Sequence, residues 1–173
     1  MPTEETLVLV KPDGVARGLT GAILARIEAK GYALVDIKLV EPDREVLEQH
    51  YAEHVGKPFY EPLVEFMLSG PSVAIRLAGN RVIEGFRSLA GTTDPTTAAP
   101  GTIRGDFGRD WGGKVQQNLV HGSDSPESAA RELAIWFCPR RAGRVWRAPR
   151  RRVRTARSGR RGAAGRGRRR PRR

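Results

Sequence analysis

The sequence predicts a mixed α/β domain over residues 1–138 and a basic tail over residues 139–173. Apolar runs of strand length alternate with segments in which apolar residues recur at helical spacing, which is typical of such a domain. After a Trp-Phe-Cys-Pro segment at 136–139, the composition shifts to Arg, Gly, Ala and Pro with almost no apolar periodicity. Because such a segment cannot bury enough apolar surface to offset its ordering entropy, we expect the tail to be disordered.

Four segments of the first part are predicted to be strands. Residues 6–10 form an apolar run of β-forming residues that ends at a turn signal, Lys-Pro-Asp-Gly, at 11–14. Residues 32–40 and 72–77 have the pattern of strands, and residues 119–121 form a short last strand. We expect these strands to pair antiparallel.

Helices are predicted between and after the strands, and two of them have a clear start signal. Asp43 can cap one helix, which carries Val46, Leu47 and His50 on its apolar stripe. The last helix begins with Ser125 as its cap, Pro126 at its first position and Glu127 in its first turn, and runs to residue 137. The remaining predicted helices contain Ile23, Leu24 and Ile27, residues 62–68, and Val82, Ile83, Phe86 and Leu89.

Composition excludes several classes of function. The chain has 173 residues, which suits one compact domain, and its single cysteine, Cys138, can form neither an internal disulfide nor a thiolate metal site. No stretch approaches the roughly 18 consecutive apolar residues of a membrane helix, and the N-terminus lacks the pattern of a signal peptide. We therefore expect a cytoplasmic protein with no membrane partner.

The net charge of +12 is concentrated in the tail. Residues 139–173 contain 17 of the 31 basic residues and no acidic one, so 14 basic and 19 acidic residues remain in the rest. Three explanations of the tail stay open: a solvated charge run, an arm that binds nucleic acid nonspecifically, or a frameshift product of GC-rich DNA.

His121 is the candidate nucleophile. It ends the last predicted strand and precedes a Gly-Ser-Asp turn, a place where side chains emerge from a rigid scaffold into a cleft. Imidazole is partly neutral at physiological pH and can form a covalent intermediate. Glu132, two turns into the last helix, can reach one ring nitrogen, and Ser123 can assist from the turn. Taken singly, a histidine in such a turn is more often structural, and His50 and His54 lack comparable surroundings.

Three basic residues are placed where they could stabilise phosphate charge. Lys11 follows the first strand, Arg87 lies on the helix before a long loop, and Arg104 lies within Gly-Thr-Ile-Arg-Gly-Asp-Phe at 101–107. Each alone is also common as a surface charge. The chain has neither a P-loop nor a Gly-x-Gly-x-x-Gly motif, so a nucleotide site would need another framework.

Several separated motifs together resemble the nucleoside diphosphate kinase family, over essentially residues 4–138. They are Thr-Leu-Val-Leu-Val-Lys-Pro-Asp-Gly at 6–14, Ser-Gly-Pro at 69–71, Asp-Pro at 94–95, Pro-Gly-Thr-Ile-Arg-Gly-Asp at 100–106 and Asn-Leu-Val-His-Gly-Ser-Asp at 118–124. The last of these contains the Asn-x-x-His-Gly-Ser-Asp signature, which is highly specific to the family.

The resemblance implies a ferredoxin-like four-stranded antiparallel sheet covered by helices, and a homo-oligomer that is a tetramer or a hexamer. It implies transfer of the γ-phosphate of a nucleoside triphosphate such as ATP to a nucleoside diphosphate, in two steps through a phosphohistidine at His121. Mg²⁺ would be the cofactor, held mainly by the nucleotide phosphates, with no metal ligand from the chain. Glu132 and Ser123 would orient His121, and Phe59 would stack on the base. Phosphates and ribose would be held by Lys11, Tyr51, Arg87, Thr93, Arg104 and Asn118.

The chain departs from the family pattern in two places. The connection between Arg104 and Asn118 is a few residues longer than usual, and the chain continues past Phe137 into the basic tail. Two other functions therefore stay open: a nucleic-acid-binding protein on the same scaffold, and an oligomeric regulatory protein.

Overall fold

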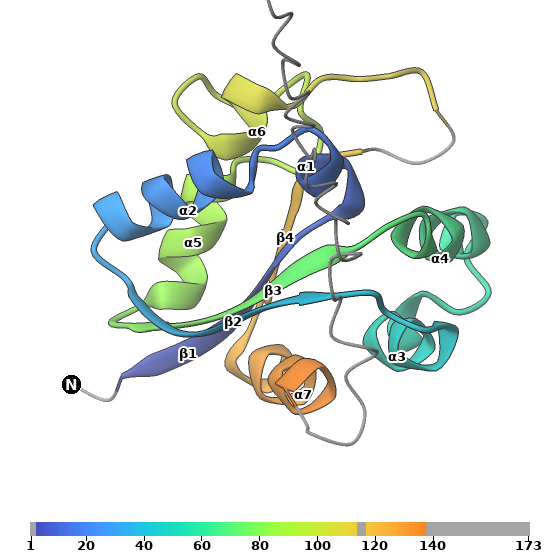
Figure 1. The fold of residues 1–173 in the computed structure, drawn as a ribbon, viewed down its shortest axis with the longest axis horizontal. Helices are drawn as coiled ribbons and strands as arrows, with labels where there is room; N and C mark the ends of the chain where they lie inside the picture. The colour runs from blue at the N-terminus through green and yellow to red at the C-terminus, as the bar shows by residue number, and fades with distance from the viewer. Residues whose placement is uncertain (1–2, 114–116, 138–173) are drawn as a thin grey trace, which may run out of the picture.

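A computed structural model describes residues 3–113 and 117–137 of the chain (Figure 1). The predicted tail at 139–173 and Cys138 lie outside the described residues. The connection between Arg104 and Asn118 is described except for residues 114–116. None of the helices in the described part is long and apolar enough to cross a membrane.

Four strands form one antiparallel sheet in the order β2-β3-β1-β4. The strands are β1 (Glu4–Val10), β2 (Ala33–Val40), β3 (Ser72–Gly79) and β4 (Val120–Gly122). β1 lies between β3 and β4 and pairs with both, while β2 pairs with the other side of β3. The prediction of a ferredoxin-like four-stranded antiparallel sheet is confirmed.

Helices cover both faces of this sheet (Figure 1). On one face, α2 (Thr20–Ala29) and α5 (Val82–Ala90) contribute apolar side chains to the same core cluster. On the other face, α3 (Arg44–His50), α4 (Tyr60–Leu68) and α7 (Pro126–Phe137) share a second cluster. The predicted arrangement of helices around a central sheet is therefore confirmed.

The central strand β1 is buried on both faces. Because successive side chains of a strand point to opposite faces, Val8 and Val10 pack with α2 and α5, whereas Leu7 and Leu9 pack with α3, α4 and α7. All four side chains are 0% exposed. Lys11 follows directly, so its backbone is anchored by the most buried strand of the sheet.

Both predicted capping residues begin their helices. Asp43 accepts a hydrogen bond at Oδ1 from the backbone N–H of Val46, at 2.9 Å. Ser125 accepts one at Oγ from the N–H of Ser128, at 3.1 Å. Such bonds satisfy N–H groups that have no partner within the helix, so these starts are fixed by local sequence.

Three short helices depart from the prediction. The expected turn at 11–14 is wrong: helix α1 (Pro12–Ala16) begins there, with proline at its first position. A 3₁₀ helix, η1 (Ala52–His54), follows α3, and α6 (Ile103–Phe107) lies in the expected long loop. Helices of three to five residues are too short to show apolar periodicity.

The edge strand β2 exposes apolar side chains. Leu34 is 42%, Val35 49% and Ile37 40% exposed. An edge strand also presents unpaired backbone N–H and C=O groups, so this edge combines two features that favour pairing with another chain.

Candidate active site

All but one of the side chains assigned from the sequence line a single cleft of about 820 Å³. Its lining includes Lys11, Tyr51, Phe59, Arg87, Thr93, Arg104, Asn118, His121 and Glu132. Ser123 does not line the cleft and is 1% exposed. Segments from both ends of the described chain thus contribute to a single site.

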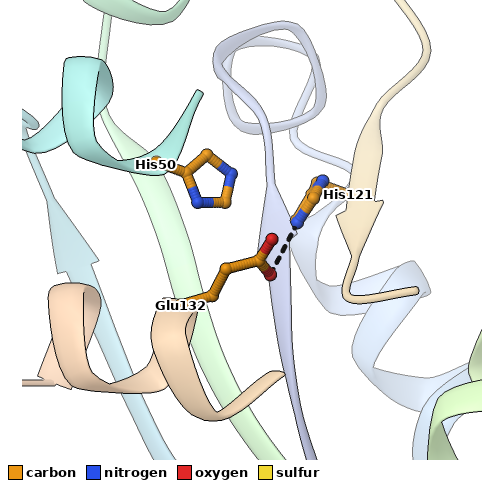
Figure 2. A group of neighbouring side chains, drawn as sticks. All are labelled: His50, His121 and Glu132. Atoms are coloured by element: carbon orange, nitrogen blue, oxygen red, sulfur yellow. Dashed lines mark hydrogen bonds and ion pairs between the residues drawn. The ribbon is translucent and has the colours of Figure 1, made fainter. Parts of the chain in front are cut away.

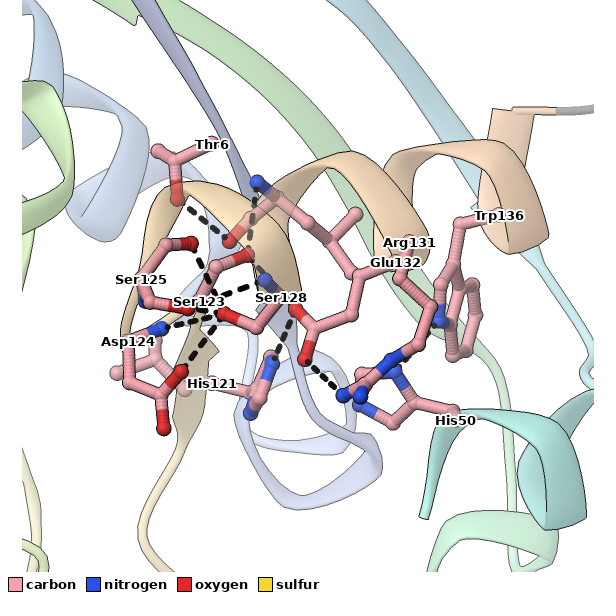
Figure 3. Close-up of polar contacts among 12 residues, drawn as sticks. Thr6, His50, His121, Ser123, Asp124, Ser125, Ser128, Arg131, Glu132 and Trp136 are labelled. Atoms are coloured by element: carbon pink, nitrogen blue, oxygen red, sulfur yellow. Dashed lines mark hydrogen bonds and ion pairs between the residues drawn. The ribbon is translucent and has the colours of Figure 1, made fainter. Parts of the chain in front are cut away.

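His121 lies on β4 and is positioned by Glu132, which lies near the middle of α7 (Figure 3). β4 packs closely on α5, because a Cβ added at Gly122 would lie 2.5 Å from the ring of Phe86. Glu132 accepts two hydrogen bonds at Oε2, one from Ser123 Oγ at 2.7 Å and one involving His121 Nε2 at 3.0 Å. A carboxylate only accepts, so Nε2 carries the proton and the lone pair of the neutral ring is on Nδ1.

Ser123 connects this arrangement to the central strand. Its backbone N–H donates to the carbonyl of Leu7, at 3.2 Å, and its Oγ accepts from the N–H of Leu7, at 3.3 Å. Ser123 therefore contacts Glu132 and not the imidazole, so it acts on His121 only through the carboxylate. Glu132 itself is 4% exposed, which shields this contact from water.

Lys11 and Asn118 form a second polar group in the cleft. Lys11 Nζ donates to Asn118 Oδ1 at 2.7 Å, and Asn118 Nδ2 donates to the carbonyl of Thr93 at 2.9 Å. Burial, followed by the positive charge of Arg104, lowers the pKa of Lys11 to about 8. The ammonium is thus poorly solvated, which strengthens its interaction with an anion.

Arg104 and Arg87 differ in how they are held. The guanidinium of Arg104 donates to three backbone carbonyls: Gly91 at 2.7 Å, Asn118 at 3.2 Å and Val120 at 2.7 Å. Burial, and to a lesser degree the charge of Arg87, lowers the pKa of Arg104 to about 10. Arg87 is exposed, and no hydrogen bond or ion pair of its side chain is found within residues 3–113 and 117–137. Arg104 therefore links α6 to the end of α5 and to the segment that leads into β4, whereas the N–H donors of Arg87 remain available to a ligand.

Asp13 supports a strained turn that the sequence did not reveal. Leu119 has a φ of 71°, a left-handed conformation that costs about 1 kcal/mol or more for a residue other than glycine. Asp13 Oδ2 accepts from the N–H of Leu119 at 3.0 Å, and the N–H of Lys11 donates to the Leu119 carbonyl at 2.8 Å. These bonds hold the turn between Asn118 and β4. In the sequence, Asp13 stands out only as part of the Lys-Pro-Asp-Gly motif at 11–14, which predicts a turn.

Aromatic side chains form one wall of the cleft. Tyr51 is 5% exposed, and burial raises the pKa of its hydroxyl. Phe59 is 44% exposed, so its ring is not part of the core. His54 lies between them, with ring centroids 5.9 Å from Tyr51 and 5.4 Å from Phe59. Phe59 thus offers an open aromatic face beside the polar groups.

His50 lies directly beside His121, contrary to the expectation from the sequence. Its ring centroid is 4.6 Å from that of His121, and its side chain is 2% exposed (Figure 2). Trp136 Nε1 donates to His50 Nδ1 at 3.2 Å, across a separation of 86 residues. Because α3, β4 and α7 create these surroundings jointly, no local pattern could have identified them.

The cluster of His50, His121 and Glu132 has the residue types of a transition-metal site. One potential ligand atom from each residue lies within 4.8 Å of the others (Figure 2). A metal ligand must offer a lone pair, however, and the bond from Trp136 places the His50 lone pair on Nδ1 and its proton on Nε2. His50 therefore faces the cluster with a donor.

The family model for nucleoside diphosphate kinase matches residues 4–142. The chain belongs to the nucleoside diphosphate kinase family. Nucleoside diphosphate kinases of Streptomyces avermitilis and Streptomyces coelicolor are each 61% identical to it over 136 residues, which cover 78% of this chain and 96% of theirs. A solved structure of a halophilic nucleoside diphosphate kinase from Halobacterium salinarum in complex with CDP is 44% identical, with a TM-score of 0.75. That match covers 85% of this chain and 95% of the other.

Nucleoside diphosphate kinases are phosphotransferases that generally use a divalent metal, and the cleft offers few oxygen ligands for one. Its carboxylates are Glu53, Asp124 and Glu132. Glu132 already accepts from His121 and Ser123, and Asp124 accepts from Ser128 Oγ at 2.7 Å. Mg²⁺ usually keeps several waters and binds phosphate oxygens with one or two carboxylates, so these residues fit a metal that arrives on the nucleotide.

Proposed function

We propose that this chain transfers the γ-phosphate of a nucleoside triphosphate to a nucleoside diphosphate through a phosphohistidine at His121. The observation that carries the assignment is the 3.0 Å contact between His121 Nε2 and Glu132, which leaves the Nδ1 lone pair for the reaction. Membership of the nucleoside diphosphate kinase family supports the activity.

The reaction then has two symmetrical halves. The Nδ1 lone pair of His121 attacks the γ-phosphorus, the bond to the β,γ-bridging oxygen breaks, and the diphosphate leaves with the electron pair. An oxygen of a second diphosphate attacks the phosphorus and displaces Nδ1 with its lone pair. The proton on Nε2 stays in place throughout, and Glu132 stabilises the positive charge that the ring gains on phosphorylation.

Fixed cations and an aromatic ring bind the nucleotide. Lys11, Arg87 and Arg104 stabilise charge on the phosphate oxygens, since phosphoryl transfer depends mainly on positioning and electrostatics. Tyr51, Thr93 and Asn118, which line the same cleft, hold phosphate and ribose. Phe59 stacks on the base through its exposed face, and stacking tolerates every base because each has a π face.

Mg²⁺ is the proposed metal and ATP the proposed donor. The ion would neutralise phosphate charge and be held mainly by the phosphates, since the cleft carboxylates of Glu132 and Asp124 already accept hydrogen bonds. We place the enzyme in the cytoplasm, where both nucleotide substrates are abundant.

A homo-oligomer, a tetramer or a hexamer, is the proposed assembly. Its support is the strand β2 at the edge of the sheet, which exposes the three apolar side chains Leu34, Val35 and Ile37. The basic tail is a second proposed contact surface. With 17 arginines and no acidic residue in 139–173, it would bind nucleic acid nonspecifically through release of counterions.

Steady-state kinetics test the covalent mechanism. When the donor concentration is varied at several fixed acceptor concentrations, we expect parallel double-reciprocal lines, because the first diphosphate leaves before the second nucleotide binds. Purified enzyme incubated with γ-labelled ATP alone should also retain acid-labile label. Intersecting lines without labelled protein would show direct transfer between bound nucleotides.

Nucleotide affinity should decrease as the pH rises through the pKa of Lys11. That pKa is lowered to about 8, so the ammonium present at pH 7 is mostly neutral at pH 9 in the free enzyme. Losing a hydrogen bond from a charged group to phosphate should weaken binding by about tenfold. Calorimetric titration with a nucleoside diphosphate from pH 7 to 9 measures the change. Lys11→Arg is the control, because arginine stays charged, and an equal decrease in that variant would contradict the assignment.

A further inference from the structure

The buried pair of Trp136 and His50 determines which nitrogen of His50 carries a proton. An indole N–H can only donate, so His50 Nδ1, at 3.2 Å from Trp136 Nε1, must accept. The neutral His50 ring therefore carries its proton on Nε2. This N–H is buried and has no hydrogen-bond partner within the described part of the chain, although the ring lies beside His121 and Glu132 (Figure 2).

A charged His50 would be incompatible with this contact. An imidazolium has N–H groups at both nitrogens, and its Nδ1–H would face the N–H of Trp136. Burial, followed by the charges of His121, Lys11, Arg131 and His54, lowers the pKa of His50 well below its usual range. The groups that face His50 are thus His121 from β4, Lys11 after β1, Arg131 and Glu132 from α7, and Tyr51 and His54 beside α3.

The protonation state of His50 matters because, within residues 3–113 and 117–137, Glu132 is the only carboxylate that forms an ion pair with His121. A charged His50 would attract the Glu132 carboxylate and compete with His121 for it. The opposite neutral form, with a lone pair on Nε2, would compete with Glu132 for the proton of His121. Either change would weaken the 3.0 Å contact that orients His121 (Figure 3).

We infer that Trp136 holds His50 in its neutral, Nε2-protonated form, and that this form leaves Glu132 and His121 paired with each other. His50 and Trp136 are thus positioning residues, which touch neither phosphate nor nucleotide and act through Glu132 and His121. The inference rests on the proposed function of His121 as the nucleophile.

Nuclear magnetic resonance of the full chain with ¹⁵N-labelled histidine tests the protonation state directly. We expect His50, assigned by the signals lost in His50→Gln, to stay neutral with its proton on Nε2 from pH 6 to 8. In Trp136→Phe, we expect the second neutral form or the charged form to become populated. A wild-type His50 that is charged or protonated only on Nδ1 would overturn the inference, and this result does not depend on catalysis.

A double-mutant cycle tests the effect on His121. Trp136→Phe should slow transfer of label from γ-labelled ATP to the protein by about 3- to 10-fold, as for the loss of one hydrogen bond, with nucleotide affinity unchanged. In a His50→Phe background, the same replacement should have little further effect, because no imidazole remains to compete. The melting temperature of each variant shows whether the replacement of Trp136 also disturbs the packing of the core. Equal slowing in both backgrounds would show that Trp136 acts only by packing, whereas an unlabelled wild-type protein would refute the phosphohistidine itself.

Discussion

Replacing His121 with Ala is expected to reduce phosphate exchange by at least about 10³-fold, because the covalent nucleophile is removed and no second route replaces it. Nucleotide binding should persist, since Lys11, Arg87 and Phe59 lie on other elements of the cleft. Coupled-enzyme rates measure the exchange, and calorimetry measures the binding of a diphosphate.

The matched control for this replacement is His54→Ala. His54 lines the same cleft but contacts Tyr51 and Phe59 instead of Glu132. It should accept label from γ-labelled ATP at His121, whereas His121→Ala should accept none. Exchange by His121→Ala at a near-normal rate would show that another group carries the phosphate.

Replacing Arg87 with Ala is expected to slow phosphate transfer by about 10²- to 10³-fold, the usual cost of losing one group that stabilises transition-state charge. Its melting temperature should stay within about 2 °C of the wild type, because an exposed side chain with no hydrogen bond or ion pair in the described part of the chain contributes little to stability. Single-turnover labelling of the protein measures the transfer, and calorimetric scanning measures the melting.

Arg104→Ala distinguishes the two arginines. It removes one hydrogen-bond donor from each of the carbonyls of Gly91, Asn118 and Val120, so the melting temperature should fall by several degrees and the transfer rate should fall as well. If Arg87→Ala lost as much stability as Arg104→Ala, the division of roles between them would be incorrect.

The sequence predicted a helix or strand correctly where the residues that determine it are close together in the chain. The Asp43 cap and the Ser125 start were correct because each hydrogen bond joins residues three apart. The helices α1 and α6 were missed because five residues cannot display a helical period, and their neighbours are polar or glycine. The exposure of β2 was equally hidden, since an apolar strand has the same pattern at an edge as within a sheet.

The residues of the candidate site could be predicted from the sequence where they lie in motifs of the nucleoside diphosphate kinase family. The resemblance placed nine side chains that line the cleft, but it could not separate the tethered Arg104 from the available Arg87. The role of His50 is not visible in the sequence because its surroundings come from β4 and α7. The role of Asp13 is not visible because its partner Leu119 is 106 residues away. Such roles depend on three-dimensional neighbours that spacing does not encode.

Because the first strand pairs with the last, we expect activity to appear only late in synthesis. β1 is the first strand, while β4 and α7, which carry His121 and Glu132, are the last elements described. While the chain is still emerging from the ribosome, β1, β2 and β3 can pack with their helices. The imidazole of His121 is not oriented until α7, which carries Glu132, has docked. We therefore expect nascent chains to take no phosphate from ATP until β4 and α7 have docked on β1.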